Sequence, residues 1–220
     1  MIVASQKPVE EIRETLKDYK KVLIAACGTC VTVCLAGGEK EAKELAALLS
    51  LSGEQEFKVV TPERQCDAEF LAEFDKDVRQ ADAVLSMACG AGVQFMAERC
   101  AGKPVIPALN TSFLGVNRDV GYWTEMCQGC GNCILEKTGG VCPVARCSKS
   151  HFNGPCGGSS NGKCEVDPSI DCGWQLIYDR LKSLNQLHRL YEIIPPRDWS
   201  TSRDGGPRKL RRTDVVTEEV

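Results

Sequence analysis

The sequence contains only two histidines, His151 and His188, among its 220 residues. This scarcity disfavours zinc enzymes built on imidazole ligands and catalysis by histidine acid–base groups. No apolar run approaches the roughly 18 residues of a transmembrane helix, and the N-terminus lacks the pattern of a secretory signal, so we expect a cytoplasmic chain. The net charge of −3 argues against a nucleic-acid-binding or anionic-membrane-binding surface.

Cysteine, in contrast, is abundant, with 14 residues in the chain. In a secreted protein this number would indicate disulfides, whereas in a chain without a signal it more often indicates metal or redox sites. Because histidine is scarce, the expected metal centres are held by thiolates. They are iron–sulfur clusters or zinc bound by four cysteines.

Residues 1–118 alternate between amphipathic helices and short apolar strands. Strands are predicted at 22–26, 57–61, 83–87 and 105–109, and helices at 8–19, 39–51, 67–79 and 92–100. Such alternation is typical of a parallel sheet with right-handed crossovers. The sequence therefore predicts an α/β fold, with a small Rossmann-like domain over residues 1–118.

The composition changes after this domain. Residues 119–195 carry eight cysteines and many glycines, and they predict an irregular, metal-stabilised domain closed by a helix over 174–193. Residues 196–220 are polar and rich in both charge signs, which is typical of a disordered tail or of an arm that orders on a partner.

Cysteines follow each of the first three predicted strands. Cys27 and Cys30 come after the first strand, Cys66 after the second and Cys89 after the third. Because the carboxyl ends of parallel strands share one edge of a sheet, these four thiols should converge on one [4Fe-4S] cluster or zinc ion, with Cys34 as a substitute ligand. The alternatives are buried small hydrophobic residues, or a redox-active or nucleophilic CxxC thiol at Cys30.

The second group of cysteines begins with Cys127, Cys130 and Cys133, whose spacing is that of three ligands of a bacterial ferredoxin cubane. The remaining ligand candidates are Cys142, Cys147, Cys156, Cys164 and Cys172. Eight thiols suffice for two four-cysteine sites, so the chain would carry two or three such sites in all. The pairing of the last five stays open, and so does a structural zinc ion at one site. Cys100 is expected in the hydrophobic core.

These motifs resemble the methylenetetrahydrofolate reductase C-terminal domain family. The similar segments are CGTCVTVCLAGGEKE near the N-terminus and then CQGCGNC, GGVCPVARCSKS, NGPCGG, GKCEVD and DCGW. The resemblance covers about residues 1–195. The chain looks like the small, cysteine-rich iron–sulfur subunit of the two-subunit enzyme found in acetogenic and related anaerobic bacteria.

The resemblance implies a role in electron transfer rather than catalysis by this chain. The partner would be a TIM-barrel flavoprotein that binds FMN and reduces methylene- to methyl-tetrahydrofolate in the reductive acetyl-CoA pathway. The small subunit would carry [4Fe-4S] clusters, with zinc also implied, and would receive electrons from ferredoxin or another electron-input subunit. The alternative is a zinc-binding docking subunit without a redox role. The sequence has no GxGxxG loop, so we expect no NAD(P) site.

The expected contact with the flavoprotein involves two segments. Residues 113–126 carry aromatic and methionine side chains, which are enriched at interfaces. The tail after Pro196 carries a basic run at 208–212, followed by Val215, Val216 and two glutamates. Both segments are predicted to contact the partner in an obligate hetero-complex.

Overall fold

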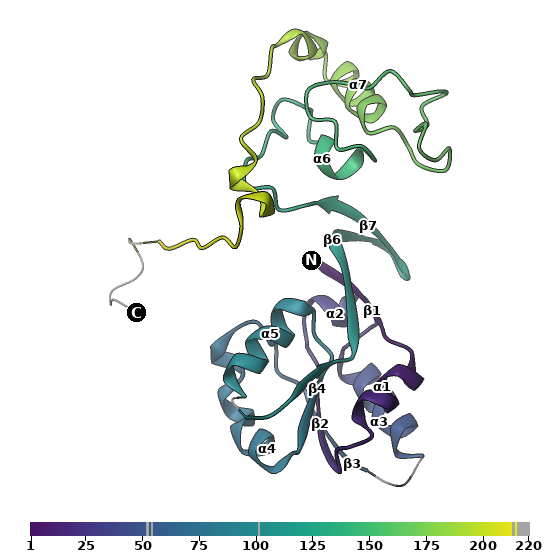
Figure 1. Cartoon of the computed structure of the whole chain (residues 1–220). Helices are drawn as coiled ribbons and strands as arrows, with labels where there is room; N and C mark the ends of the chain where they lie inside the picture. The colour runs from purple at the N-terminus through teal and green to yellow at the C-terminus, as the bar shows by residue number, and fades with distance from the viewer. Residues whose placement is uncertain (52, 54, 101, 213, 215–220) are drawn as a thin grey trace. The chain divides into compact units, whose positions relative to one another are not determined.

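The computed structural model of the chain describes residues 1–51, 53, 55–100, 102–212 and 214. It forms two compact units, Met1–Thr124 and Glu125–Val220 (Figure 1). Within the described residues, no helix is long and apolar enough to cross a bilayer.

The first unit is built on a parallel sheet of four strands. In chain order these are β2 (Lys21–Ala25), β3 (Glu56–Val60), β4 (Ala83–Ser86) and β5 (Val105–Pro107). Their spatial order is β3-β2-β4-β5, and all neighbours run parallel. The two central strands, β2 and β4, are almost wholly buried, which explains why they read as continuous apolar runs.

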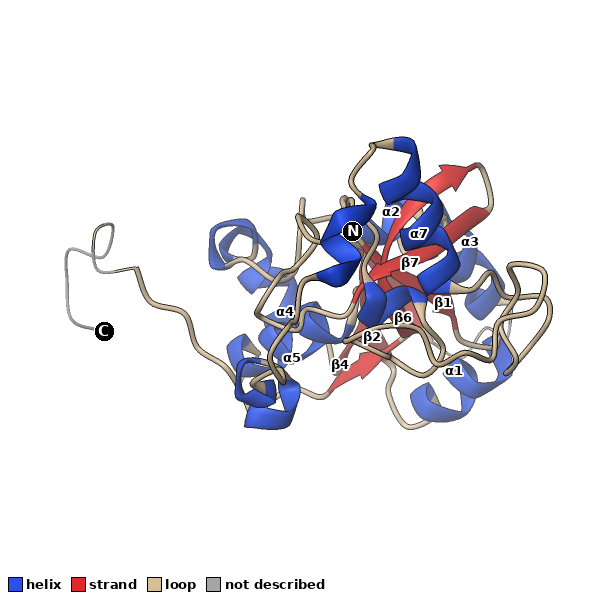
Figure 2. Cartoon of the chain, turned by 90° about the horizontal axis from the view of Figure 1, so that it is seen from above, coloured by secondary structure: helices blue, strands red, loops and turns tan. Residues whose placement is uncertain are grey.

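Helices pack on both faces of this sheet (Figures 1 and 2). The helices are α1 (Val9–Leu16), α2 (Cys30–Val33), α3 (Glu39–Ser50), α4 (Asp75–Gln80) and α5 (Gly90–Arg99). Because side chains alternate along a strand, Ile24 of β2 packs with α1 and α3, whereas its neighbour Leu23 packs in the cluster that contains Met96 of α5. The result is a mixed α/β unit with a hydrophobic core on each face of the sheet.

A second, three-stranded sheet has no counterpart in the sequence prediction. It consists of β1 (Ile2–Gln6), β6 (Leu109–Asp119) and β7 (Tyr122–Cys127), in the order β1-β6-β7. β1 pairs antiparallel with β6, more than 100 residues away in the chain. A two-residue turn joins β6 to β7, and Gly121 there has a φ of 79°, which favours glycine.

Two predicted helices are also shorter than expected. The helix predicted at 67–79 is replaced by two 3₁₀ turns, η1 (Ala68–Phe70) and η2 (Ala72–Phe74), followed by α4. Asp67 does cap the first turn, since its carboxylate accepts from the Glu69 N–H at 3.3 Å. The helix predicted at 174–193 is α7 (Gly173–Ser183), which ends just before Asn185, a residue in the left-handed region with φ 55°.

The second unit has little regular structure. Besides α7 it contains α6 (Pro143–Arg146), η3 (Leu187–Tyr191), η4 (Trp199–Thr201) and η5 (Arg203–Gly205). Its main hydrophobic cluster is built on three buried residues of α7, which are Trp174, Ile177 and Leu181. The cysteine-bearing loops therefore lie around a small core.

Candidate metal centres

The carboxyl edge of the parallel sheet gathers the four cysteines that follow β2, β3 and β4. Burial raises the pKa of the Cys66 thiol, and the negative charges of Cys89, Cys27 and Cys30 raise it further. Cys66 thus lies near enough to the other three cysteines to feel their charge, although the four are spread from position 27 to position 89 of the chain.

A buried glutamine holds the loop that carries Cys66. Gln65 is fully buried, and its Nε2 donates to the carbonyls of Ala25 at 2.7 Å and Ala26 at 2.9 Å. The hydroxyl of Ser86 donates to Gln65 Oε1 at 2.6 Å. One side chain therefore ties this loop to the ends of both β2 and β4, and no motif in the sequence pointed to it.

The loop after β2 is fixed by close backbone contacts. The Cys27 N–H donates to the Gly37 carbonyl at 2.9 Å, and the Gly28 N–H donates to the Pro62 carbonyl at 3.1 Å. A Cβ at Gly37 would lie 2.1 Å from the Met87 carbonyl oxygen, so only glycine fits there. This packing holds the loop from Cys27 against the ends of the neighbouring strands.

Cys34 and Cys100 occupy hydrophobic surroundings. Burial raises the pKa of both thiols. Cys34 also lies 3.4 Å from the Ile2 carbonyl oxygen, to which its thiol donates, and Cys100 belongs to the same cluster as Met96. Cys34 is therefore engaged with β1, while Cys100 lies in the core, as expected from the sequence.

Two aromatic side chains of residues 113–126 pack beside Cys27, one of the four cysteines at the carboxyl edge of the parallel sheet. Phe113 and Trp123 pack against the cluster that contains Cys27 and Cys34, whereas Tyr122 is exposed. The Trp123 Nε1 atom is buried and has no hydrogen-bond partner within the described residues. The buried N–H is thus available to a group that would occupy this side of the unit.

In the second unit, Cys127 is the last residue of β7, and Cys130 and Cys133 lie on the irregular loop that follows it. The Gly129 N–H donates to Cys127 Sγ at 3.3 Å, and Gly129 and Gly131 both have positive φ. Backbone N–H groups directed at sulfur are typical of thiolate metal sites. The loop thus has a backbone suited to holding thiolates.

The segment that follows Pro196 lies against this loop. Arg197 donates from Nη1 to the Asn132 carbonyl at 2.7 Å and from Nη2 to the Cys130 carbonyl at 2.9 Å. Arg208 donates to the Gly129 carbonyl at 2.5 Å, and Thr201 donates to the Cys130 carbonyl at 3.1 Å. Residues 197–208 thus contact the chain's own cysteine loop, while Val215, Val216 and the two glutamates lie outside the described residues.

Aromatic rings hold the Arg197 side chain in place. Its guanidinium carbon lies 5.1 Å from the Phe152 ring centroid and 4.9 Å from that of Trp199, within the range of cation–π contacts. Trp174, in contrast, is buried and donates from Nε1 to the His151 carbonyl at 2.8 Å. Phe152 and Trp174 therefore serve the internal packing of the second unit.

The other cysteines of this unit fall into two places. Cys142 precedes α6, whose first residue is Pro143. Four cysteines instead line one small cavity, together with Lys149 and Glu165. These four are Cys147, Cys156, Cys164 and Cys172.

Residues 106–200 match the family model described as "Methylene-tetrahydrofolate reductase C terminal". The matched range covers less than half of the chain, and it includes β6, β7, α6, α7 and all eight cysteines of the second group. No curated protein and no solved structure matches the chain. The family match thus covers the cysteine-rich region, whereas the resemblance described from the sequence extended to residue 1.

The thiols are gathered without being in coordinating positions. Across the described ranges, no three histidine, cysteine, aspartate or glutamate side chains are placed so that they could hold one metal ion. Metal binding would therefore require the thiols to move closer together. The fold thus brings the cysteines into groups but does not place their sulfur atoms at coordination distance.

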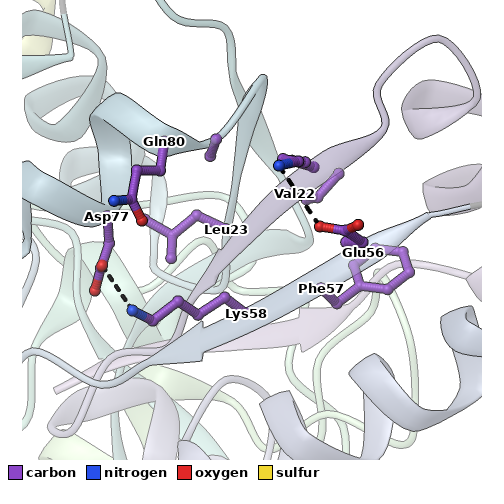
Figure 3. A pocket seen from close by; sticks show the side chains of 9 residues that line it. Val22, Leu23, Glu56, Phe57, Lys58, Asp77 and Gln80 are labelled. Atoms are coloured by element: carbon purple, nitrogen blue, oxygen red, sulfur yellow. Dashed lines mark hydrogen bonds and ion pairs between the residues drawn. The ribbon is translucent and has the colours of Figure 1, made fainter.

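A further pocket lies at the amino ends of the strands (Figure 3). It is lined by the first residues of β2 and β3 and by α4, with no cysteine among its lining residues. Its charges form ion pairs, Lys58 with Asp77 at 2.6 Å and Lys21 with Glu56 at 3.8 Å. Ligands of open parallel sheets bind at the carboxyl ends of the strands, so this pocket is not the candidate site.

Proposed function

We propose that the chain is an electron-transfer subunit that carries [4Fe-4S] clusters and delivers electrons to the FMN of a TIM-barrel methylenetetrahydrofolate reductase subunit. The catalysed reaction, in the partner, would be reduction of methylene- to methyl-tetrahydrofolate in the reductive acetyl-CoA pathway. The match of residues 106–200 to the reductase C-terminal family supports the assignment to this enzyme system. Ferredoxin or another electron-input subunit would supply the electrons.

The gathering of Cys27, Cys30, Cys66 and Cys89 carries this proposal. Burial raises the pKa of the Cys66 thiol, and the negative charges of Cys89, Cys27 and Cys30 add to the rise. The cationic core of an iron–sulfur cluster would offset the negative charges around Cys66, and four thiolates are the ligand set of a [4Fe-4S] cluster. The cluster with its four thiolates is anionic as a whole, and the buried Trp123 N–H, which has no hydrogen-bond partner among the described residues, packs beside Cys27 and suits a nearby anionic group. The residues at this edge of the sheet thus fit such a centre.

When bound, an iron–sulfur cluster supplies one-electron transfer. The chain's residues would hold the thiolates and exclude water. Gln65 fixes the loop before Cys66, and Phe113 and Trp123 cover the side that contains Cys27. In the second unit, Arg197 and Arg208 fix the backbone of the loop that would hold a cluster through Cys127, Cys130 and Cys133.

Metal analysis of anaerobically purified protein tests the proposal. We expect brown protein with about four iron and four sulfide per cluster, which bleaches with dithionite. Cys66→Ser should lose one cluster, whereas the matched control Cys100→Ser, at a buried core cysteine, should keep it. Colourless wild-type protein with stoichiometric zinc and no sulfide would refute the electron-transfer role.

A zinc-stabilised docking subunit is the second candidate. The small hydrophobic cluster of the second unit favours it, because loops around so small a core need metal to fold. Reduction of the partner's flavin with and without this chain separates the two candidates. A docking subunit would bind the flavoprotein without accelerating reduction of its FMN.

The contacts of the C-terminal segment refine the test of the partner interface. Removing residues 197–220 would also remove the hydrogen bonds of Arg197 and Arg208 to the cysteine loop. The appropriate truncation therefore begins after Arg208. If residues 209–220 contact the flavoprotein, this truncation should weaken co-purification and leave the iron content unchanged.

A further inference from the structure

Four cysteines of the second unit line one cavity, although they are spread from position 147 to position 172. We propose that Cys147, Cys156, Cys164 and Cys172 form a single tetrathiolate metal site. It would be separate from the centre that Cys127, Cys130 and Cys133 would hold. The sequence alone left the pairing of these four cysteines open.

Tight backbone packing brings the first and last of the four together. Cys147 immediately follows α6, and Cys172 immediately precedes α7. A Cβ at Gly173 would lie 2.7 Å from the Arg146 carbonyl oxygen and 2.9 Å from the Cys147 nitrogen. Glycine at position 173 thus allows the start of α7 to contact the end of α6, which places Cys147 and Cys172 side by side.

The loop between them folds back on itself and returns Cys164 to the same place. The Cys172 N–H donates to the Gly162 carbonyl at 2.8 Å, and the Cys164 N–H donates to the Ile170 carbonyl at 2.9 Å. Isolated bridges join Lys163 to both Ser160 and Asp171. These contacts close the loop over residues 160–172 without any hydrophobic core of its own.

Polar groups surround the sulfurs of the loop cysteines. The Gly158 N–H donates to Cys156 Sγ at 3.4 Å, as the Gly129 N–H does to Cys127 in the other cysteine group. Cys164 Sγ lies 3.5 Å from the Ser148 hydroxyl. Backbone N–H groups that donate to sulfur, as that of Gly158 does, are typical of the surroundings of thiolate metal ligands.

A charged pair completes the cavity wall. Lys149 Nζ lies 3.8 Å from Cys156 Sγ and forms an ion pair with Glu165, whose carboxylate accepts from the Cys156 thiol at 3.6 Å. A lysine beside several thiolates offsets part of the negative charge that they acquire when metal replaces their protons. All four cysteines are free thiols, so no disulfide competes for them.

The ligand of this site is a thiophilic metal centre, either one zinc ion or one iron–sulfur cluster, because both are held by four thiolates. The thiols line the cavity without standing at coordinating positions, so binding would draw the loops inward. By elimination, Cys142 is left to complete the group of Cys127, Cys130 and Cys133. The site does not depend on the electron-transfer role, since a zinc ion would satisfy it equally well.

Metal and sulfide analysis of the full chain, purified anaerobically, tests the grouping. Cys164→Ser and Cys172→Ser should each lose the same single metal complement, and the double variant should lose no more than either alone. Cys130→Ser should lose a different complement, and Cys100→Ser should lose none. Loss of one zinc would identify a mononuclear site, and loss of about four iron with four sulfide would identify a cluster. Two successive losses in the double variant would overturn the grouping.

A second measurement uses the unmodified chain and so does not depend on the folding of variants. The native protein is treated with a thiol-alkylating reagent while a chelator is added stepwise, and each cysteine is followed by mass spectrometry. Cys147, Cys156, Cys164 and Cys172 should become reactive together, at one chelator concentration. If the four react in separate steps, or react fully before chelator is added, the proposal is wrong. Iron retained at the other cysteines would then leave the proposed electron-transfer function standing.

Discussion

Replacement of Gln65 by methionine should destabilise the first unit far more than an exposed substitution would. The two side chains are similar in size, so the change removes hydrogen bonds with little change in packing. Wild-type Gln65 donates to the carbonyls of Ala25 and Ala26 and accepts from the hydroxyl of Ser86. The substitution leaves those three buried groups without this partner.

The expected loss of stability depends on which hydrogen bonds each of the three groups keeps. The Ala25 carbonyl still accepts from the Met87 N–H at 2.8 Å, so it is not left unsatisfied. The Ala26 carbonyl and the Ser86 hydroxyl lose the bonds to Gln65, and a buried polar group without a partner costs about 1–3 kcal/mol. The free energy of unfolding should therefore fall by about 2–6 kcal/mol.

Hydrogen exchange followed by mass spectrometry measures this cost within the first unit. The slowest amides of β2 and β4 should exchange at least about thirtyfold faster in Gln65→Met than in the wild type. A double-mutant cycle adds a second criterion. Gln65→Met combined with Ser86→Ala should cost less than the sum of the single changes, because the unsatisfied hydroxyl is gone. Strictly additive effects, or a cost below about 0.5 kcal/mol, would refute this reasoning.

Three further predictions concern the cysteine loop, the sheet and the metal. Arg197→Gln removes the two charge-assisted bonds to the loop carbonyls, so alkylation of Cys130 by a thiol reagent should accelerate several-fold, whereas Arg203→Gln, in the next turn, should leave it unchanged. Backbone N–H groups, chiefly that of Lys21, hold the pKa of Asp82 below its usual value. Asp82 therefore contributes stability that is present above its unfolded-state pKa of about 3.9 and is lost as the pH falls through the lower folded-state value. The free energies of unfolding of Asp82→Asn and of the wild type, measured with denaturant, should differ at neutral pH and become equal in acid. A difference that stays constant with pH would contradict this prediction. Finally, chelator treatment should make residues 125–212 sensitive to protease while residues 1–124 resist, because the proposed metal sites would supply order that the small core of the second unit does not. Equal resistance of both parts would argue against that contribution of metal.

The sequence by itself predicted the parallel sheet of the first unit. Continuous apolar runs identify β2 and β4, because strands that are buried on both faces need apolar side chains at every position. The placing of Cys27, Cys66 and Cys89 after successive strands was enough to predict that they converge, since parallel strands end at one edge. These patterns can be read from short segments of sequence. The connections between the parallel strands then follow the general preference for right-handed crossovers.

The tertiary structure alone decided the features that depend on distant partners. β1 pairs with β6 across more than 100 residues, and Arg197 contacts Cys130 across 67 positions. Cys147 and Cys172 line the same cavity because Gly173 allows one close backbone contact between α6 and α7. Helical and strand periodicity report only which face of a segment is buried, whereas these contacts depend on loop conformations that no period encodes.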